Sequence, residues 1–171
     1  MDNFNKSLIV KKGMKGEIIS KFYIKYIKCE NVQNINNDYR YDFLTNKSTY
    51  EIKTDYQYKV YKSLFIEFES KSRKSGIFTT QAINYIFICP LEMNEYFLVE
   101  VSTEKIKEII KNNVLKIKYA ACFDYNDEKT SYINKGYILP FELLNDCTTF
   151  INFNKFHEKY ENLLNYLEKK I

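Results

Sequence analysis

The hydrophobic positions of this chain change their period several times, and each change predicts a new element. In residues 13–29, apolar side chains recur at helical spacing with lysines between them, which predicts an amphipathic helix. In residues 39–55, apolar and polar residues alternate on both sides of "TNKS", which predicts a β-hairpin. The alternation resumes in "LFIEFES", an expected third strand in which Glu67 and Glu69 share one face with Phe65.

The second half of the chain carries longer apolar runs. "INYIFICP" is apolar on both faces and predicts a buried central strand, with which "YFLVEV" is expected to pair. Ser102 or Thr103 can cap a helix across "EKIKEIIKNN". "VLKIKYAACFDY" predicts one or two strands, "NDEKTSYINKG" predicts a loop, and residues 154–171 predict an amphipathic helix. This order of elements indicates a mixed α/β (α+β) fold with a central mixed sheet of about five strands flanked by helices.

Length and composition indicate one globular domain over residues 1–171. Its 45% hydrophobic content is enough for a real core, and a net charge of +4 permits a polyanionic partner without requiring one. The four cysteines lack zinc-type spacing, and the first residues are too polar for a signal peptide. No apolar run has the length of a membrane span, so no membrane partner is expected and a reducing cytoplasm is the expected location.

One face of the predicted hairpin carries an unusual set of charges. A turn centred on "NK" sets Asp42 opposite Glu51 and Arg40 opposite Lys53. Opposed side chains project from the same face with Cβ atoms about 4.5–5.5 Å apart, so two carboxylates point at one place. Like charges in this position destabilise a hairpin unless something offsets them, and a divalent cation does so. Lys53, on the same face as Glu51, is suited to hold a water beside the metal or to meet the charge of a phosphate.

These residues resemble the motif of the PD-(D/E)XK nuclease superfamily, which includes many restriction endonucleases and Holliday-junction resolvases. Asp42 matches the first metal-binding acid of that family, "EIK" at residues 51–53 matches its (D/E)-x-K element, and Glu17 fits the acid often found in the preceding helix. The segment "FIEFESKSRKSGIFTTQAINYIFI" is similar to phage-type members, and the likeness covers roughly residues 13–90. The sequence departs from the family pattern in two places: no proline precedes Asp42, and Asn84 stands where Asp is common.

The resemblance implies a restriction-endonuclease-like core and an endodeoxyribonuclease that uses Mg²⁺ or Mn²⁺ to hydrolyse DNA, leaving a 5′-phosphate. Asp42 and Glu51 would bind the metal, the Ile52 carbonyl would add a ligand, and Lys53 would position or activate the water. The implied partner is DNA, with branched or replicating DNA as a candidate substrate, in a bacterial or phage-infected host cell. A homodimer is compatible with this role, since cutting two strands usually takes two sites.

Other polar residues have two interpretations each. Glu67 would serve a second metal position or orient a water if its strand lies beside that of Glu51; otherwise it is an exposed edge-strand charge. Lys71, Arg73 and Lys74 form a basic loop that suits backbone phosphates or is simply solvated.

Two sets of residues are expected to have no part in the chemistry. Thr79 and Thr80 are expected as helix caps rather than phosphate contacts. His157, the single histidine, is expected at the surface.

Two other functions stay open. One is a catalytically inactive nucleic-acid-binding or interaction module on the same fold. The other is an unrelated structural domain in which the hairpin charges form cross-strand ion pairs worth only about 0.2–1 kcal/mol each.

Overall fold

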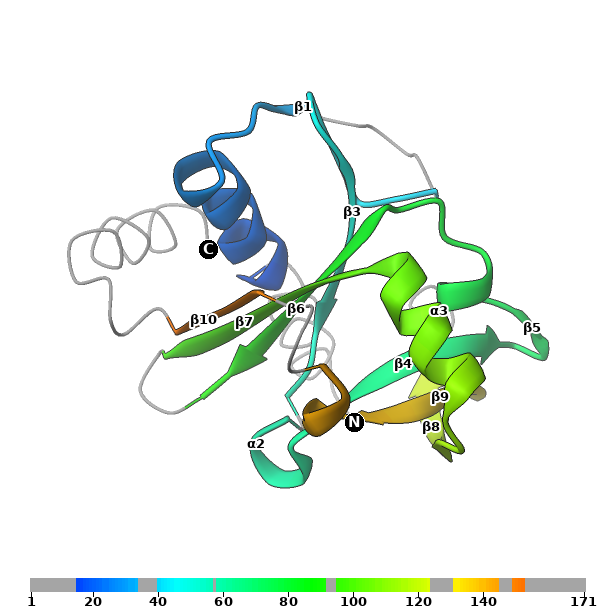
Figure 1. Ribbon diagram of the computed structural model, residues 1–171. Coiled ribbons are helices and arrows are strands. Elements are labelled where there is room, and N and C mark those ends of the chain that lie inside the picture. The colour runs from blue at the N-terminus through cyan, green and yellow to red at the C-terminus, as the bar shows by residue number, and fades with distance from the viewer. Residues whose placement is uncertain are drawn as a thin grey trace.

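The computed structural model describes residues 15–33, 40–56, 58–91, 95–123, 131–144 and 149–152 (Figure 1). Within these residues the larger sheet consists of β1 (Val32–Gln33), β2 (Phe43–Thr45), β3 (Thr49–Thr54), β6 (Asn84–Pro90), β7 (Tyr96–Ser102) and β10 (Thr149–Asn152), in that spatial order. The smaller sheet consists of β5 (Arg73–Lys74), β4 (Ser63–Ser70), β9 (Ser131–Pro140) and β8 (Lys116–Phe123), in that spatial order. Neighbouring strands are antiparallel except β3 and β6, which are parallel, so the larger sheet is mixed.

The larger sheet separates two hydrophobic cores (Figure 1). On one face lies the first helix, which covers residues 15–22 and continues into the π-helix η1 (Tyr23–Ile27). On the other face lie α3 (Thr103–Asn112) and the smaller sheet. The chain is therefore a mixed α/β domain, as the pattern of elements predicted.

Several local predictions are confirmed. The predicted first helix is helical over residues 15–27 and so ends two residues before its predicted end at Cys29, while its first two residues lie outside the described part of the chain. α3 is capped by Ser102, whose Oγ accepts a hydrogen bond from the Lys105 N–H at 3.1 Å, and its Ile106 and Ile109 are buried. The apolar run "INYIFICP" is β6, which lies between β3 and β7 as a central strand.

Two predictions about strands are wrong. The expected third strand, β4, does not lie beside β3; it belongs to the smaller sheet, and the place beside β3 is taken by β6, whose two apolar faces suit a position covered on both sides. The segment "NDEKTSYINKG" was expected to be a loop, but residues 131–136 belong to β9. Pairing with β8 on one side and β4 on the other makes these residues a strand, although Ser131 and Ile133 are exposed. The predicted helix over residues 154–171, with His157, lies outside the described residues.

Short helices complete the connections. α2 (Tyr58–Tyr61) joins β3 to β4, the 3₁₀ helix η2 (Gly76–Phe78) follows β5, and η3 (Phe141–Leu144) follows β9. After β3 the chain passes through β4 and β5 of the smaller sheet and then through η2. It returns to the larger sheet as β6, which pairs with β3. This path sets the surroundings of the predicted site.

Candidate active site

The β2–β3 hairpin has the register that the position of its turn predicts. The pairs are Phe43 with Tyr50 and Leu44 with Thr49. Tyr50 and Ile52 are buried in the core beneath the first helix. Glu51 and Lys53 alternate with them along β3 and so project from the opposite face, toward the smaller sheet.

Asp42 lies one residue before β2 and outside the regular ladder, so it does not form the predicted cross-strand pair with Glu51. Its backbone N–H donates to the Tyr50 carbonyl at 2.9 Å, and its Oδ2 accepts a hydrogen bond from the Ile52 N–H at 2.6 Å. The Ile52 N–H therefore bonds to a side-chain oxygen of Asp42, where a regular ladder would have a backbone carbonyl. Such exchanges occur where strand pairing is locally irregular. The Asp42 carboxylate is thereby held at the edge of β3, next to Glu51.

Both oxygens of the Glu51 carboxylate have partners. Lys53 Nζ lies 2.6 Å from Oε1, and the Thr80 hydroxyl donates to Oε2 at 3.1 Å. The Glu51 side chain is only 14% exposed, whereas that of Lys53 is 42% exposed. Lys53 is therefore the more accessible member of the pair.

Thr80 and Arg40 do not have the roles that the sequence predicted. The Thr80 hydroxyl lies 3.3 Å from the Arg40 carbonyl, in addition to its contact with Glu51, so Thr80 supports the hairpin rather than capping a helix. Arg40 does not pair across the ribbon with Lys53, because the ladder described between β2 and β3 ends at Phe43. Its guanidinium lies 5.4 Å from the centre of the Tyr41 ring.

The charged groups of the site shift one another's pKa values. Desolvation and the negative charge of Glu51 raise the pKa of Asp42, although the hydrogen bond from Ile52 and the charge of Lys53 act in the opposite direction. Desolvation lowers the pKa of Lys53, but the carboxylates of Glu51, Asp42 and Glu67 outweigh it and leave that pKa above its ordinary value. Lys53 is thus a cation at neutral pH, and three acids from different segments lie within its electrostatic reach.

The first helix contributes Glu17 at the edge of this group. A Cβ added at Gly16 would lie 2.0 Å from Thr54 Oγ1, so a larger residue there would require the Thr54 side chain to shift. Partial burial and the negative charge of Asp42 raise the pKa of Glu17. The helix acid expected from the sequence therefore lies near enough to Asp42 to interact with its charge.

Glu67 faces the site from the smaller sheet, and the Ser-Gly-Ile turn fixes its carboxylate. Ser75 Oγ donates to Glu67 Oε1 at 2.5 Å, and Asn134 Nδ2 donates to Oε2 at 2.6 Å. Gly76 has a φ of +51°, and a Cβ there would lie 2.2 Å from the Glu67 carbonyl oxygen. Ile77, the third residue of the turn, is buried in the core, so the turn is anchored against β4.

The predicted common face of Glu67 and Glu69 is wrong. A β-bulge shifts the β4–β9 register so that Glu67 pairs with Gly136 and Glu69 with Lys135. Because Lys135 and Gly136 are consecutive in β9, the two glutamates project from opposite faces. Glu69 forms an ion pair with Lys135 at 2.6 Å, whereas Glu67 is the glutamate of β4 whose charge acts on Lys53.

Tyr85 belongs to the site although no sequence signal marked it. It pairs with Glu51 in the parallel β3–β6 register, and its hydroxyl is buried without a hydrogen-bond partner in the described residues. Desolvation and then the charges of Glu51, Glu67 and Asp42 raise its pKa. Thr80 acts on this pKa in the opposite direction, and the buried Tyr85 hydroxyl lies within the electrostatic influence of three carboxylates.

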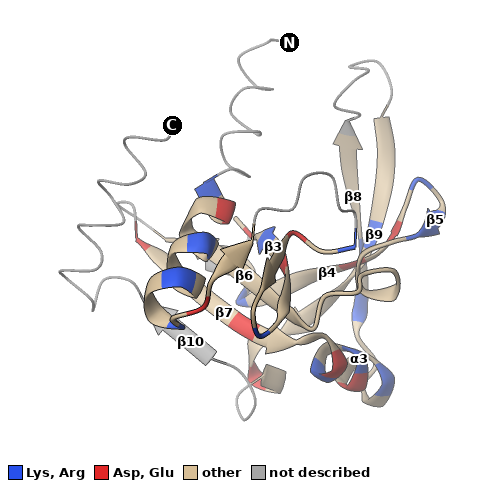
Figure 2. Cartoon of the chain, turned by 90° about the horizontal axis from the view of Figure 1, so that it is seen from above, with Lys and Arg blue, Asp and Glu red and all other residues tan. Residues whose placement is uncertain are grey.

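The basic residues Lys71, Arg73 and Lys74 lie on a tight hairpin rather than a loop. Lys71 and Ser72 both have positive φ values and reverse the chain between β4 and β5. All three residues are exposed, and the ribbon at β5 is blue in Figure 2. Lys71 Nζ lies 4.7 Å from the centre of the Tyr132 ring on β9.

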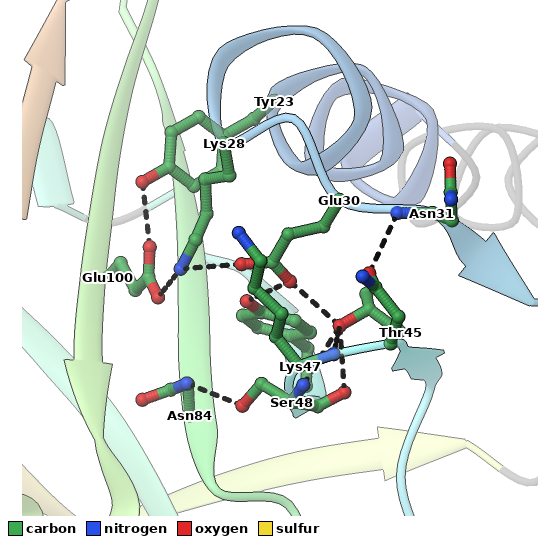
Figure 3. A network of polar contacts seen from close by, with 11 residues as sticks. Tyr23, Lys28, Glu30, Asn31, Thr45, Lys47, Ser48, Asn84 and Glu100 are labelled. Carbon is green, nitrogen blue, oxygen red and sulfur yellow. Dashed lines mark hydrogen bonds and ion pairs between the residues drawn. The ribbon is translucent and has the colours of Figure 1, made fainter.

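A separate polar network lies on the other face of the larger sheet (Figure 3). Lys28 forms ion pairs with Glu100 and, at 3.8 Å, with Glu30. Hydroxyl groups complete the network: Tyr23 donates to Glu100 at 2.7 Å, and Thr45 and Tyr50 donate to Glu30 at 2.7 and 2.9 Å. The network ties the end of the first helix to the sheet and is distinct from the candidate site.

Asn84, the departure from the family pattern, belongs to that second face. Its Nδ2 donates to Ser48 Oγ at 2.9 Å (Figure 3). In the β3–β6 register it pairs with Tyr50 rather than with Glu51. Asn84 therefore supports the turn of the hairpin and does not face the acids.

The donor set of the site suits a hard cation. Among the described residues, no three His, Cys, Asp or Glu side chains lie close enough together to hold a metal ion by themselves. Mg²⁺ is commonly held by one or two carboxylates together with waters and substrate phosphates, and Asp42 with Glu51 is such a pair.

Comparisons with known proteins give no family assignment. No family model matches the sequence, and no curated protein or solved structure matches it significantly. None of the helices in the described ranges is both long and apolar enough to cross a membrane.

Proposed function

We propose that this protein is an Mg²⁺- or Mn²⁺-dependent DNA endonuclease with a restriction-endonuclease-like core of the PD-(D/E)XK type. The observation that supports it most is that Asp42, Glu51 and Lys53 lie together beside β3. Their charges shift the pKa values of Asp42 and Lys53, and Lys53 forms an ion pair with Glu51. These are the same three positions that carry the family motif in the sequence. A structural role alone gives no reason for placing two acids side by side, because their repulsion opposes folding.

In the proposed reaction the protein binds and orients the scissile phosphate. Asp42, Glu51 and the Ile52 carbonyl are the residues that would hold the metal, which when bound polarises the phosphate and lowers the pKa of a water. Lys53 has an exposed, flexible side chain, so its ammonium can turn from Glu51 toward a phosphate oxygen and stabilise the charge that develops there.

Two outer carboxylates have supporting roles in this proposal. Glu67, held on both oxygens by Ser75 and Asn134, is placed to orient the attacking water or to serve a second cation. Glu17 raises the negative charge beside Asp42 and so favours a cation there. The exposed basic residues of the β4–β5 hairpin are proposed to contact DNA phosphates.

The proposal is tested by incubating the protein with supercoiled, linear, single-stranded and four-way-junction DNA, with Mg²⁺, with Mn²⁺ and with EDTA. We expect cleavage that needs the metal and is lost in Asp42→Asn. The matched control is Glu69→Gln, which also removes a carboxylate but on the opposite face of β4, where Glu69 contacts Lys135. Cleavage by Asp42→Asn at the wild-type rate would overturn the assignment. Binding without cleavage of any DNA form would favour an inactive nucleic-acid-binding module.

A further inference from the structure

A cavity of about 240 Å³ opens beside Lys53, between the two sheets. Its lining comes from both of them: Lys53, Thr54, Asp55 and Tyr56 at the end of β3, Phe87 on β6, Phe65 on β4, and Lys118 and Ala120 on β8. The residue that the proposed reaction places at the phosphate is therefore also part of the cavity wall. Whatever occupies the cavity lies next to the reacting group.

The walls are mainly apolar and aromatic. Phe65, Phe87 and Tyr56 supply aromatic side chains, and Ala120 is the smallest residue of the lining. A Cβ added at Gly136 would lie 2.4 Å from the Phe65 ring, so a glycine in β9 allows that ring to lie across the neighbouring strand.

The lining of the cavity carries charged groups of both signs. The carboxylate of Asp55 accepts hydrogen bonds from the backbone N–H groups of Tyr58 and Phe65, each at 3.1 Å, and so is engaged in holding the β3–β4 connection. Lys53 and Lys118 also line the cavity, with Lys53 Nζ 2.6 Å from Glu51 Oε1 and Lys118 Nζ 4.9 Å from the centre of the Tyr61 ring. The cavity thus combines aromatic walls with two lysines and one aspartate, so its lining has a net positive charge, which complements an aromatic ring joined to an anion.

Size restricts the ligand to a single ring system. Pockets for whole small molecules usually have about 300–1,000 Å³, and this cavity is smaller. A base that is stacked and paired in a duplex must be extruded before it can enter such a cavity, whereas an unpaired base is free to enter. Aromatic side chains bind unpaired bases by stacking with little dependence on sequence.

We infer that this cavity receives the base of one unpaired nucleotide adjacent to the phosphate that is cut. This inference rests on the proposed nuclease function and specifies its substrate class: DNA with an unpaired segment, such as a single strand, a gap or a branch, in preference to a continuous duplex. Lys53, which lines the cavity, meets the phosphate next to that base.

The test uses binding, which can be measured in EDTA without cleavage. Fluorescence anisotropy is recorded for labelled single-stranded, gapped and continuous duplex DNA of equal length at one salt concentration. Ala120→Trp fills the cavity, whereas Ala121→Trp adds the same side chain to the next residue of β8, which projects from the opposite face and is exposed. Phe65→Leu, which removes an aromatic wall and keeps an apolar side chain, is a second variant in case the larger residue disturbs folding.

We expect the wild-type protein to bind single-stranded and gapped DNA more tightly than the duplex. Ala120→Trp and Phe65→Leu should lose about 5- to 150-fold in affinity for DNA with an unpaired base, the range expected for one stacked base, with little change for the duplex. Ala121→Trp should bind all forms as the wild type does. Equal affinity of the wild type for all forms, or equal effects of Ala120→Trp and Ala121→Trp, overturns the inference.

The two proposals fail in different ways. Metal-dependent cleavage without a preference for unpaired DNA would remove the cavity assignment and keep the nuclease. Selective, cavity-dependent binding without cleavage would remove the nuclease and keep the cavity as a base-binding site.

Discussion

Replacing Lys53 by alanine separates a role in catalysis from a role in stability. Lys53 Nζ lies 2.6 Å from Glu51 Oε1, but the lysine side chain remains 42% exposed. Ion pairs at such positions contribute about 0.2–1 kcal/mol, so the free energy of unfolding should fall by no more than ~1 kcal/mol. For a domain of this length, that loss lowers Tm by about 2–4 °C at most.

The effect of Lys53→Ala on cleavage should be much larger. Loss of one group that stabilises the charge of a transition state costs about 10²- to 10³-fold in rate, which corresponds to about 2.7–4 kcal/mol in the barrier. Metal binding should persist, because an ammonium group offers no ligand to Mg²⁺. DNA affinity should fall only slightly, since one lysine is a small part of an interface made of several phosphate contacts.

The matched control is Lys135→Ala. Lys135 Nζ also lies 2.6 Å from a glutamate oxygen, that of Glu69, and its side chain is 35% exposed, but the pair projects away from the candidate site. Single-turnover cleavage of labelled DNA, thermal unfolding and gel shift on the same preparations should show a small change in Tm for both variants and a loss of rate for Lys53→Ala alone. An unchanged rate in Lys53→Ala, or an equal loss in both variants, would refute the catalytic role of Lys53.

Three further outcomes are expected. Because the pKa of Asp42 is raised above its ordinary value of 3.8 by desolvation and by Glu51, the folded state binds this proton more tightly than the unfolded state, and stability falls as the pH rises above about that value. Without divalent cations, Asp42→Asn should therefore be more stable than the wild type at pH 7 and similar to it at pH 3.5. The variant should also lose any stabilisation by Mg²⁺. Thermal unfolding at both pH values, with and without Mg²⁺, checks both results, and a less stable variant at pH 7 without Mg²⁺ would contradict the first. Lys28→Met breaks the ion pair with Glu100, whose side chain is 11% exposed, so the free energy of unfolding in denaturant should fall by about 3–5 kcal/mol. A loss below about 1 kcal/mol would show that the network of Figure 3 does not stabilise the fold. Gly76→Ala should cost about 1–3 kcal/mol in the same assay, because φ is +51° and the added methyl would meet a backbone oxygen at 2.2 Å; unchanged stability would contradict this strain.

Features set by neighbours in the chain could be predicted from the sequence. The helical period predicted the first helix and α3, and the run of apolar residues on both faces predicted the central position of β6. The turn fixed the pairing of Phe43 with Tyr50, because in a hairpin the turn sets the register of the residues that follow it. The common face of Glu51 and Lys53 followed from the two-residue period of a strand.

Contacts between distant segments could not be predicted in this way. The alternating pattern of β4 predicts a strand but carries no information about which strand will be its neighbour. The bulge that turns Glu69 away from Glu67 arises from pairing with β9, more than sixty residues later in the chain. Thr80 and Asn134 bind the site carboxylates only because the crossing of the two sheets brings them there.

The sequence by itself therefore determined which residues could act together on the hairpin, namely Glu51 and Lys53 on one face with an acid preceding the turn. The tertiary structure decided how they are surrounded. It placed Asp42 against the Ile52 N–H, brought Glu67 and Tyr85 to the same charges, and formed the cavity beside Lys53. The physical reason is that the alternation of side chains along a strand depends on local backbone geometry, whereas burial, charge interactions and cavities depend on which distant surfaces pack together.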